Sequence, residues 1–388
     1  MRAVTVRFLP LIELLQQGWG WRRWGVLLFT LQVGVAVAQE APILLGTTAA
    51  FSGAFAEYGE EYRKGADACL AAINAAGGVR GRPVRIDYLD DGYEASRTVK
   101  NAQVLAAKGV VAFVNLVGTG NLLALAPELE TLKIPVVGVS SGAVQLREPG
   151  GGRQWIYHSK ASYGDEFRGF GTVLPTLGLT NVALVYQDNA FGKAGLESAK
   201  VVFDRPGQSA PQVLVGAKPE QIAEAARKTA ELQPQVVILI AAGAGAPEFI
   251  AEYQKAAGEL ARVAVLSIVG GRVLTTRLGE QVAGVMTSLV YPSPWSKSRR
   301  VVRSYQMAMT AAGQIPTLLS FEGCLNLRLT VEALKNAAEL TPAGVRRALE
   351  RGLTLDDGDF VLRFKPGSQI ASTYTSLGIY RANGLIRE

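Results

Sequence analysis

The sequence predicts an α/β fold built from two parallel sheets, each flanked by helices. Two observations support this prediction. Short apolar segments, which are typical of buried parallel strands, alternate with longer segments whose apolar residues recur at helical spacing. This alternation runs from residue 43 to residue 139 and then repeats from residue 182 to residue 289. The chain has 388 residues, which is long enough for two such domains.

The first series begins at Ile43 and contains four predicted strands joined by helices. Gly77 and Gly78 end the first helix, because glycine readily adopts the left-handed backbone that follows a helix. The predicted strands are 43–47, 84–88, 110–115 and 135–139, and the predicted helices are 58–76, 99–106 and 122–132.

The second series repeats this order, and a different pattern follows it. Its predicted strands are 182–186, 213–215, 236–240, 263–267 and 285–289, and helices are predicted later at 297–312, 322–338 and 342–352. The last segment, 360–384, alternates apolar and polar residues around glycine and asparagine. This pattern predicts a β-hairpin.

Residues 1–38 have the pattern of a secretory signal. Arg22 and Arg23 precede an apolar stretch from Trp24 to Val37, and a small-x-small cleavage pattern ends at Ala38. The apolar stretch of about 14 residues is shorter than the roughly 20 residues that span a bilayer. We therefore expect a signal peptide that is cleaved after Ala38. An uncleaved anchor is the alternative, and the position of the true start codon stays open.

The net charge bears on whether the chain binds nucleic acid or membranes, and the cysteine content bears on whether it contains a disulfide. The net charge of +7 is modest, and its densest cluster, 297–303, is interpreted as a solvated helix face rather than a nucleic-acid or membrane patch. The two cysteines, Cys69 and Cys324, both lie in apolar helical patterns. That position favours buried free thiols, although an exported protein could join them in a disulfide.

Four loops that follow predicted strands are rich in small residues, hydroxyls or amides. They span 50–58, 115–121, 139–143 and 186–192. Ligands of open parallel sheets bind beyond the carboxyl ends of the strands. Each loop also leads into a helix, whose first N–H groups favour an anion. We therefore expect a ligand-binding site at these loops.

The sequence lacks the patterns that catalysis would need. Gly138–Gly142 matches the G-x-S-x-G nucleophile pattern around Ser140, but no aspartate separates Ser140 from His158, the single histidine. His158 is interpreted as a packed or hydrogen-bonded residue near a domain crossing. Asp90 and Asp91 are interpreted as a solvated turn that caps the next helix. No nucleotide-binding loop or metal-ligand spacing is present, so we expect no cofactor, no metal and no enzyme activity.

Taken together, these stretches resemble the branched-chain amino-acid (Leu/Ile/Val) binding protein family. Its members are solute-binding receptors of ABC importers with the type I periplasmic binding fold. The resemblance covers nearly the whole chain after the leader. It is carried by FSGAFAEYG, INAAGGVRGRPV, VGTGN, IPVVGVSSGA, ASYGDE, VYQDNAFGKAG and SFEGCLNL.

The resemblance implies a monomeric periplasmic receptor with two lobes. Three hinge crossings are expected near 157–162, 289–295 and 353–358. The N-terminal lobe would comprise 41–158 and 292–355, and the C-terminal lobe 159–291 and 356–388. The receptor would close on a small-molecule ligand and deliver it to an ABC permease in the inner membrane, with no nucleic acid as a partner. The alternatives are a periplasmic sensor without transport, a transcription regulator of related fold and a Ser140-dependent hydrolase. A leader stands where the regulator would need a DNA-binding domain.

In this family, hydroxyls and main-chain N–H groups of the first lobe hold a ligand carboxylate, and residues of the second lobe close over it. The matching positions of the first lobe are Gly118, Thr119, Ser140, Ser141 and Gly142, with Ser52 and Tyr58 bordering the cleft, and those of the second lobe are Tyr163 and Phe191. Several have structural alternatives, because Thr119 and Ser141 could cap helices and the two aromatic residues could be packing residues.

The chain departs from the family where a ligand ammonium would bind. Val269 occupies the place of the acid that meets the ammonium, Gly245 replaces an aromatic residue, and Gly142 replaces a hydroxyl. A buried unpaired ammonium is costly. We therefore expect a carboxylate or neutral amide solute without an α-amino group, unless Asp188 or Glu322 supplies the missing acid.

Overall fold

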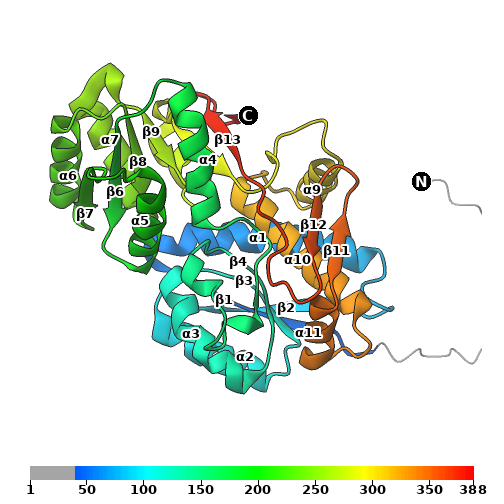
Figure 1. Ribbon diagram of the computed structural model, residues 1–388. Coiled ribbons are helices and arrows are strands. Elements are labelled where there is room, and N and C mark those ends of the chain that lie inside the picture. The colour runs from blue at the N-terminus through cyan, green and yellow to red at the C-terminus, as the bar shows by residue number, and fades with distance from the viewer. Residues whose placement is uncertain (1–39) are drawn as a thin grey trace, which may run out of the picture. The chain divides into compact units, whose positions relative to one another are not determined.

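The computed structural model describes residues 40–388, and two sheets organise this part of the chain (Figure 1). The first sheet has five parallel strands in the order β2-β1-β3-β4-β5. Its strands are β1 (Ile43–Ala49), β2 (Val84–Asp90), β3 (Ala112–Leu116), β4 (Val136–Val139) and β5 (Ile156–Tyr157). The four strands predicted for this series are confirmed to within a few residues. The predicted signal peptide lies outside the described residues.

The second sheet has seven strands in the order β14-β13-β10-β9-β8-β6-β7. Strands β6 to β10 run parallel, whereas β13 and β14 run antiparallel to their neighbours. The strands are β6 (Val182–Gln187), β7 (Gln212–Val215), β8 (Val236–Ile240), β9 (Val263–Val265), β10 (Met286–Leu289), β13 (Ser376–Tyr380) and β14 (Ile386–Arg387). The predicted α/β fold with two parallel sheets is therefore confirmed, with an antiparallel edge added to the second sheet.

Helices pack on each sheet and bury both of its faces, which explains why β3 and β8 are buried along their whole length. The five-stranded sheet packs against α1 (Ala56–Ala75), α2 (Ala95–Ala107) and α10 (Leu318–Asn336). Further out, α3 (Thr119–Leu132) packs against α2, whereas α9 (Arg300–Ala311) and α11 (Pro342–Glu350) pack against α10. The seven-stranded sheet packs against α4 (Tyr163–Thr176), α5 (Ala190–Phe203) and α6 (Pro219–Glu231). Helix α7 (Gly245–Ala257) packs against α6, and α8 (Arg272–Leu278) packs against α7. Within residues 40–388, no helix is both long enough and apolar enough to cross a membrane.

The predicted C-terminal hairpin over 360–384 is wrong. Strand β12 (Val361–Phe364) pairs antiparallel with β11 (Leu353–Asp356), the strand before it, and β13 joins β10 of the second sheet instead. The physical reason is loop length. The short loop 357–360 is typical of a hairpin connection, whereas the segment 365–375 is long enough to carry the chain from β12 to the other sheet.

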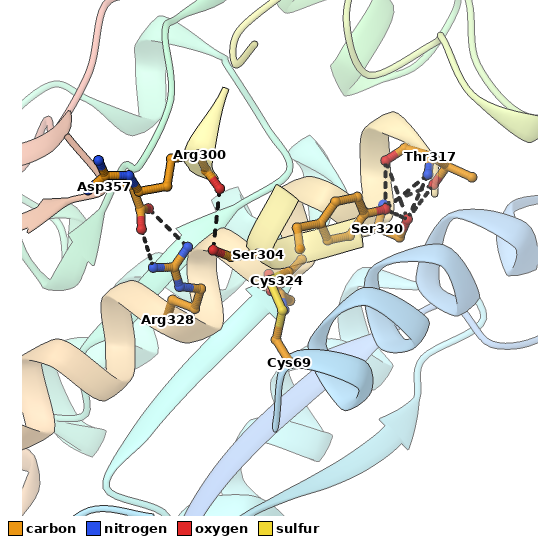
Figure 2. Close-up of a disulfide and its surroundings, with 11 residues drawn as sticks. Cys69, Arg300, Ser304, Thr317, Ser320, Cys324, Arg328 and Asp357 are labelled. Carbon is orange, nitrogen blue, oxygen red and sulfur yellow. Dashed lines mark hydrogen bonds and ion pairs between the residues drawn. A yellow bond between two sulfur atoms is a disulfide. The ribbon is translucent and has the colours of Figure 1, made fainter. Parts of the chain in front are cut away.

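The expectation of free thiols is also wrong, because Cys69 of α1 and Cys324 of α10 form a disulfide (Figure 2). Their Cα atoms are 5.5 Å apart. The two helices approach closely through glycine. A Cβ on Gly65 would clash with the carbonyl oxygen of Ser320, and one on Gly323 would clash with that of Tyr62. This close contact brings together two thiols that are 255 residues apart in sequence.

The chain passes from β5 to α4 through residues 158–162, near the first expected crossing. His158 lies in this passage and is buried, with Nε2 3.2 Å from the carbonyl oxygen of Leu146. Burial lowers the pKa of its imidazole well below the ordinary value. The interpretation of His158 as a packed, hydrogen-bonded residue is therefore confirmed. Residues 40–388 form one compact unit, so the lobe boundaries stay a prediction.

Candidate ligand-binding site

A small cavity lies where β3 and β4 end, and residues of the second sheet close it from the other side. Six of the nine predicted ligand-binding residues line it: Tyr58, Gly118, Thr119, Ser140, Tyr163 and Phe191. The other lining residues are Phe55, Tyr93, Val117, Ala242 and Ile268. The structure therefore brings together residues from four strand-end loops, as expected from the rule for open parallel sheets.

One wall of the cavity is a group of neutral hydrogen-bond donors. The main-chain N–H of Gly118 donates to the Ser140 hydroxyl (3.2 Å), so the proton of Ser140 is left for another acceptor. The hydroxyls of Thr119 and Ser141 lie 2.9 Å apart. Thr119 is also the first residue of α3, whose first-turn N–H groups have no acceptor within the helix and carry partial positive charge.

Tyr163 completes this group of donors. It is the first residue of α4, which the Ser162 side chain caps. Burial raises the pKa of the Tyr163 phenol to about 12, and hydrogen bonds with Thr119 and Ser141 oppose this shift. A Cβ on Gly142 would lie 2.6 Å from Cδ1 of Tyr163. The tyrosine ring therefore explains why position 142 has no side chain.

Aromatic rings form most of the remaining wall. Phe55 stacks on Tyr93 with ring centroids 3.9 Å apart, and Tyr163 meets Phe191 edge to face at 5.5 Å. The phenol oxygen of Tyr58 accepts a hydrogen bond of 3.1 Å from the main-chain N–H of Gly243, which follows β8. Tyr58 thus links α1 to a loop of the second sheet.

Sequence reasoning missed five of the lining residues, and Tyr93 shows why. The interpretation of the Asp90–Asp91 turn as solvated is wrong for Asp91, which is buried and accepts hydrogen bonds from Thr48 and Thr98. Its Oδ1 also accepts from the main-chain N–H of Tyr93 (2.9 Å) and so fixes the start of the loop that carries this ring. Phe55 could have been noticed, because it lies in the loop 50–58 that was expected to border the site.

Three predicted residues do not line the cavity. Ser52 is exposed, and its hydroxyl donates to Asp90 at 2.6 Å. Ser141 lies behind the lining and contacts it through Thr119. Gly142 lies beneath the ring of Tyr163 and accepts a hydrogen bond of 2.7 Å from the main-chain N–H of that residue.

No charged side chain is among the described residues that line the cavity. Val269 is buried, and its neighbour Ile268 contributes to the wall. The two candidate acids are engaged elsewhere. Asp188 pairs with Lys193 at 2.7 Å on the surface, and Glu322 pairs with Lys160 at 2.9 Å in the interior. The cavity thus presents neutral donors and aromatic rings.

The volume of the cavity is about 20 Å³, which is roughly the space that one water molecule needs. Its walls come from helices and loops attached to both sheets, with Tyr58 of α1 and Thr119 of α3 on one side and Phe191 of α5 and Ala242, which follows β8, on the other. A larger solute therefore requires these walls to separate.

Residues 42–374 match a family model described as periplasmic binding protein. The chain belongs to this family. Its members are solute-binding proteins, in agreement with the expectation that the chain is not an enzyme. Among the described residues, no group of three or more histidine, cysteine, aspartate or glutamate side chains could hold a metal ion.

This periplasmic binding protein is similar to proteins from several organisms. It is 26% identical over 180 residues to Leu/Ile/Val-binding protein homolog 3 of Brucella melitensis, a match that covers 46% of this chain and 48% of that protein. The chain thus spans about half the length of this curated relative. The resemblance to the Leu/Ile/Val-binding family is confirmed by these two findings.

Solved structures support the same fold over nearly the whole chain. An extracellular ligand-binding receptor from Verminephrobacter eiseniae has a TM-score of 0.81 and 27% identity, covering 90% of this chain and 100% of that one. A solute binding protein of an ABC transporter from R. palustris, in complex with benzoate, has a TM-score of 0.76 and 17% identity, covering 89% and 95%. At that identity, the second comparison shows the fold alone.

Proposed function

We propose that this protein is the receptor of an ABC importer and binds a small carboxylate solute without an α-amino group. The observation that carries the proposal is the composition of the cavity. Neutral hydroxyls and the start of α3 form one wall, aromatic rings form most of the rest, and none of the described residues that line it is charged. The benzoate-bound protein from R. palustris is an example of this fold with an aromatic acid.

The carboxylate would bind at the wall that carries the donors. Ser140, Thr119 and Tyr163 each have a hydroxyl at or beside the cavity, and the positive end of the α3 dipole favours a negative charge there. The solute's apolar part would contact Phe55, Tyr93 and Phe191. An α-ammonium would be buried without an acid, which is unfavourable.

Binding would be coupled to a hinge motion, because the walls belong to both sheets and leave room for about one water molecule when they are together. Small-angle scattering tests this step with benzoate and 3-phenylpropanoate as probes. The radius of gyration should fall as either acid saturates the protein. An unchanged radius at saturation would contradict a hinged receptor and favour a rigid scaffold.

The proposal includes export and a membrane partner. We expect cleavage after Ala38 and release into the periplasm, where the loaded receptor, as a monomer, would meet its permease. N-terminal sequencing of the exported protein should begin at Gln39, and a product that retains Trp24–Val37 would contradict cleavage. Deleting the gene should abolish uptake of the solute. Normal uptake with a lost cellular response would favour the alternative, a sensor without transport.

A further inference from the structure

The strands β3 and β4, which lead to Thr119 and Ser140, share an irregularity. Asn115 of β3 and Gly138 of β4 lie at the same register position, between the paired residues 114 and 137 on one side and 116 and 139 on the other. Both have a left-handed backbone, with φ of 58° and 70°, a conformation that is uncommon for residues other than glycine. The directions in which the two strands end therefore depend on these two positions.

The side chain of Asn326 contacts both positions. Asn326 is fully buried on α10, the helix that packs against β3 and β4 (Figure 1). Its Nδ2 donates to Oδ1 of Asn115 at 2.8 Å, and a Cβ at position 138 would clash with its amide. A left-handed asparagine persists only where its surroundings hold it. Asn115 is held from its other end as well, because its Nδ2 donates to the main-chain carbonyl of Gly323 at 3.1 Å.

Further hydrogen bonds join Asn326 to two segments in which the chain passes from one sheet to the other. Oδ1 of Asn326 accepts from the hydroxyl of Ser159, in the passage 158–162. The oxygen of Ser159 accepts in turn from the phenol of Tyr291 at 2.8 Å. Tyr291 lies in the passage 290–299, which runs from β10 to α9. The strand ends at the site are thus linked to both passages.

The passage 365–375, from β12 to β13, meets the same point through its main chain. The N–H of His158, the residue before Ser159, donates to the carbonyl of Gln369 at 2.7 Å. The carbonyl of His158 accepts from the N–H of Ala371 at 2.8 Å. In the described chain, three passages between the sheets therefore meet around residues 158 and 159.

One carbonyl fixes the direction of every side-chain bond in this series. A carbonyl oxygen only accepts, so Asn115 must turn Nδ2 to Gly323 and Oδ1 to Asn326. Asn326 therefore donates through Nδ2 and accepts through Oδ1. The hydroxyl of Ser159 is left to donate to Asn326 and to accept from Tyr291. A buried network whose bonds are all satisfied holds its side chains in one arrangement.

We propose that Asn326 is a positioning residue of the ligand site, which holds the ends of β3 and β4 so that Thr119 and Ser140 face one ligand group. Ser159 and Tyr291 fix its amide to the passages. None of the four side chains of the network lines the candidate site, here the first cavity, and Tyr291 lines a second, smaller one. Asn326 therefore acts on a ligand only through other residues. The inference rests on the proposed function, in which Thr119 and Ser140 hold the carboxylate.

Hydrogen exchange of the ligand-free mature chain tests the positioning role without a ligand. Asn326→Leu branches at the same carbon but cannot form these bonds, so the main-chain N–H groups of 116–120 and 139–143 should exchange at least tenfold faster. The matched control is Thr330→Val, because Thr330 is buried on the same helix and its hydroxyl donates to the main-chain carbonyl of Asn326 at 2.8 Å. Equal exchange of 116–120 in the two variants would overturn the proposal.

A double-mutant cycle tests whether Asn326 acts through Thr119. In calorimetric titrations with 3-phenylpropanoate, Asn326→Leu and Thr119→Val should each weaken binding at least tenfold. The double variant should bind at most threefold more weakly than the weaker single variant, because the first substitution has already displaced the donor that the second removes. Thr330→Val should leave affinity unchanged. Losses that multiply in the double variant would overturn the proposal, since independent sites behave in that way.

Ser159→Ala tests the proposal even if Asn326→Leu fails to fold. This variant keeps the bond between Asn326 and Asn115 but removes the link to the passages. It should raise the exchange rate of 116–120 at least threefold and weaken binding of 3-phenylpropanoate to a similar degree. An unchanged exchange rate would overturn the proposal. If the unaltered chain binds no carboxylate probe, the proposed function fails, whereas the exchange of the ligand-free variants still decides the role of Asn326.

Discussion

The first cavity and the cluster around Lys160 are both buried between the two sheets, but they use polar groups in opposite ways. In the cluster, Lys160 pairs with Glu322 at 2.9 Å, and both side chains are almost completely buried. Glu166 accepts a hydrogen bond of 2.8 Å from the main-chain N–H of Ser267. Burial raises the pKa of both carboxyls, and Lys160 opposes the shift in each case. By contrast, the polar groups that the described residues present to the cavity are neutral hydroxyls and N–H groups.

This difference distinguishes polar groups that stabilise the fold from polar groups that are available to a ligand. The charges of the cluster are committed to one another, and they join the passage 158–162 to α10 and α4. In the cavity, the Ser140 hydroxyl accepts from the main-chain N–H of Gly118 and keeps its own proton, whereas one of the two protons of Thr119 and Ser141 is used in the bond between them. Glu322 was a candidate partner for a ligand ammonium, and its pairing with Lys160 shows why it does not line the first cavity.

The largest expected effect comes from removing the cation of the cluster. Lys160→Met leaves the buried Glu322 without its partner, so the free energy of unfolding should fall by about 3–5 kcal/mol. Urea denaturation measures this loss. The matched control is Lys193→Met, which breaks the exposed pair with Asp188 and should change stability by less than about 1 kcal/mol. Equal losses in the two variants would contradict a structural role for the cluster.

The disulfide should stabilise the fold nearly as much as the Lys160–Glu322 pair does, and it should not affect ligand affinity. Replacing Cys69 and Cys324 by serine should lower the free energy of unfolding by about 2–5 kcal/mol, because the link joins helices that are distant in sequence. The affinity for 3-phenylpropanoate, measured by calorimetry, should not change, since neither cysteine lines the first cavity. A large loss of affinity would show that the α1–α10 contact shapes the cavity.

Glu61 should make stability depend on pH. Its folded-state pKa of about 7 lies above the ordinary value of 4.5. The folded protein therefore binds more protons than the unfolded chain between these values, and stability should fall as the pH rises through this window. The loss should reach about 3 kcal/mol at most. Urea denaturation at pH 5 and pH 8 should show a smaller loss in Glu61→Gln than in the unaltered protein. Glu60→Gln, on the same helix, is the control, and parallel pH profiles for all three proteins would contradict the assignment.

The smallest change is expected from one hydroxyl of the cavity. Thr119→Val should weaken binding of 3-phenylpropanoate by about 1–3 kcal/mol, because a polar atom of the ligand loses its partner. Stability should change much less. Thr172→Val, at an exposed position of α4, should leave affinity unchanged. Full affinity in Thr119→Val would show that Thr119 only begins its helix.

The secondary structure could be predicted because its signals are local. Apolar periodicity placed the parallel strands, and the strand ends placed Thr119 and Ser140 at the cavity. The disulfide could not be predicted in this way, since it depends on contact between α1 and α10 through Gly65 and Gly323. The pairing of β12 with β11 was missed because both pairings satisfy the same alternating pattern.

The positions of some residues around the site could not be predicted from the sequence, because they depend on tertiary contacts. Asp90 and Asp91 are chemically equal neighbours, yet one bonds the exposed Ser52 and the other is buried and bonds the main chain of Tyr93. Only the packing of the surrounding loops decides which of them faces solvent. For the same reason, Ser52 was expected at the cleft and Tyr93 was not.

The most direct test of the central claim is a calorimetric comparison of acids with their α-amino analogues. The pairs are 4-methylpentanoate with leucine, 3-methylbutanoate with valine and 3-phenylpropanoate with phenylalanine. The titrations use the unaltered mature chain. Each acid should bind at least tenfold more tightly than its amino analogue, because no acid among residues 40–388 lines the first cavity to receive an ammonium. Tighter binding of all three amino acids would contradict the account.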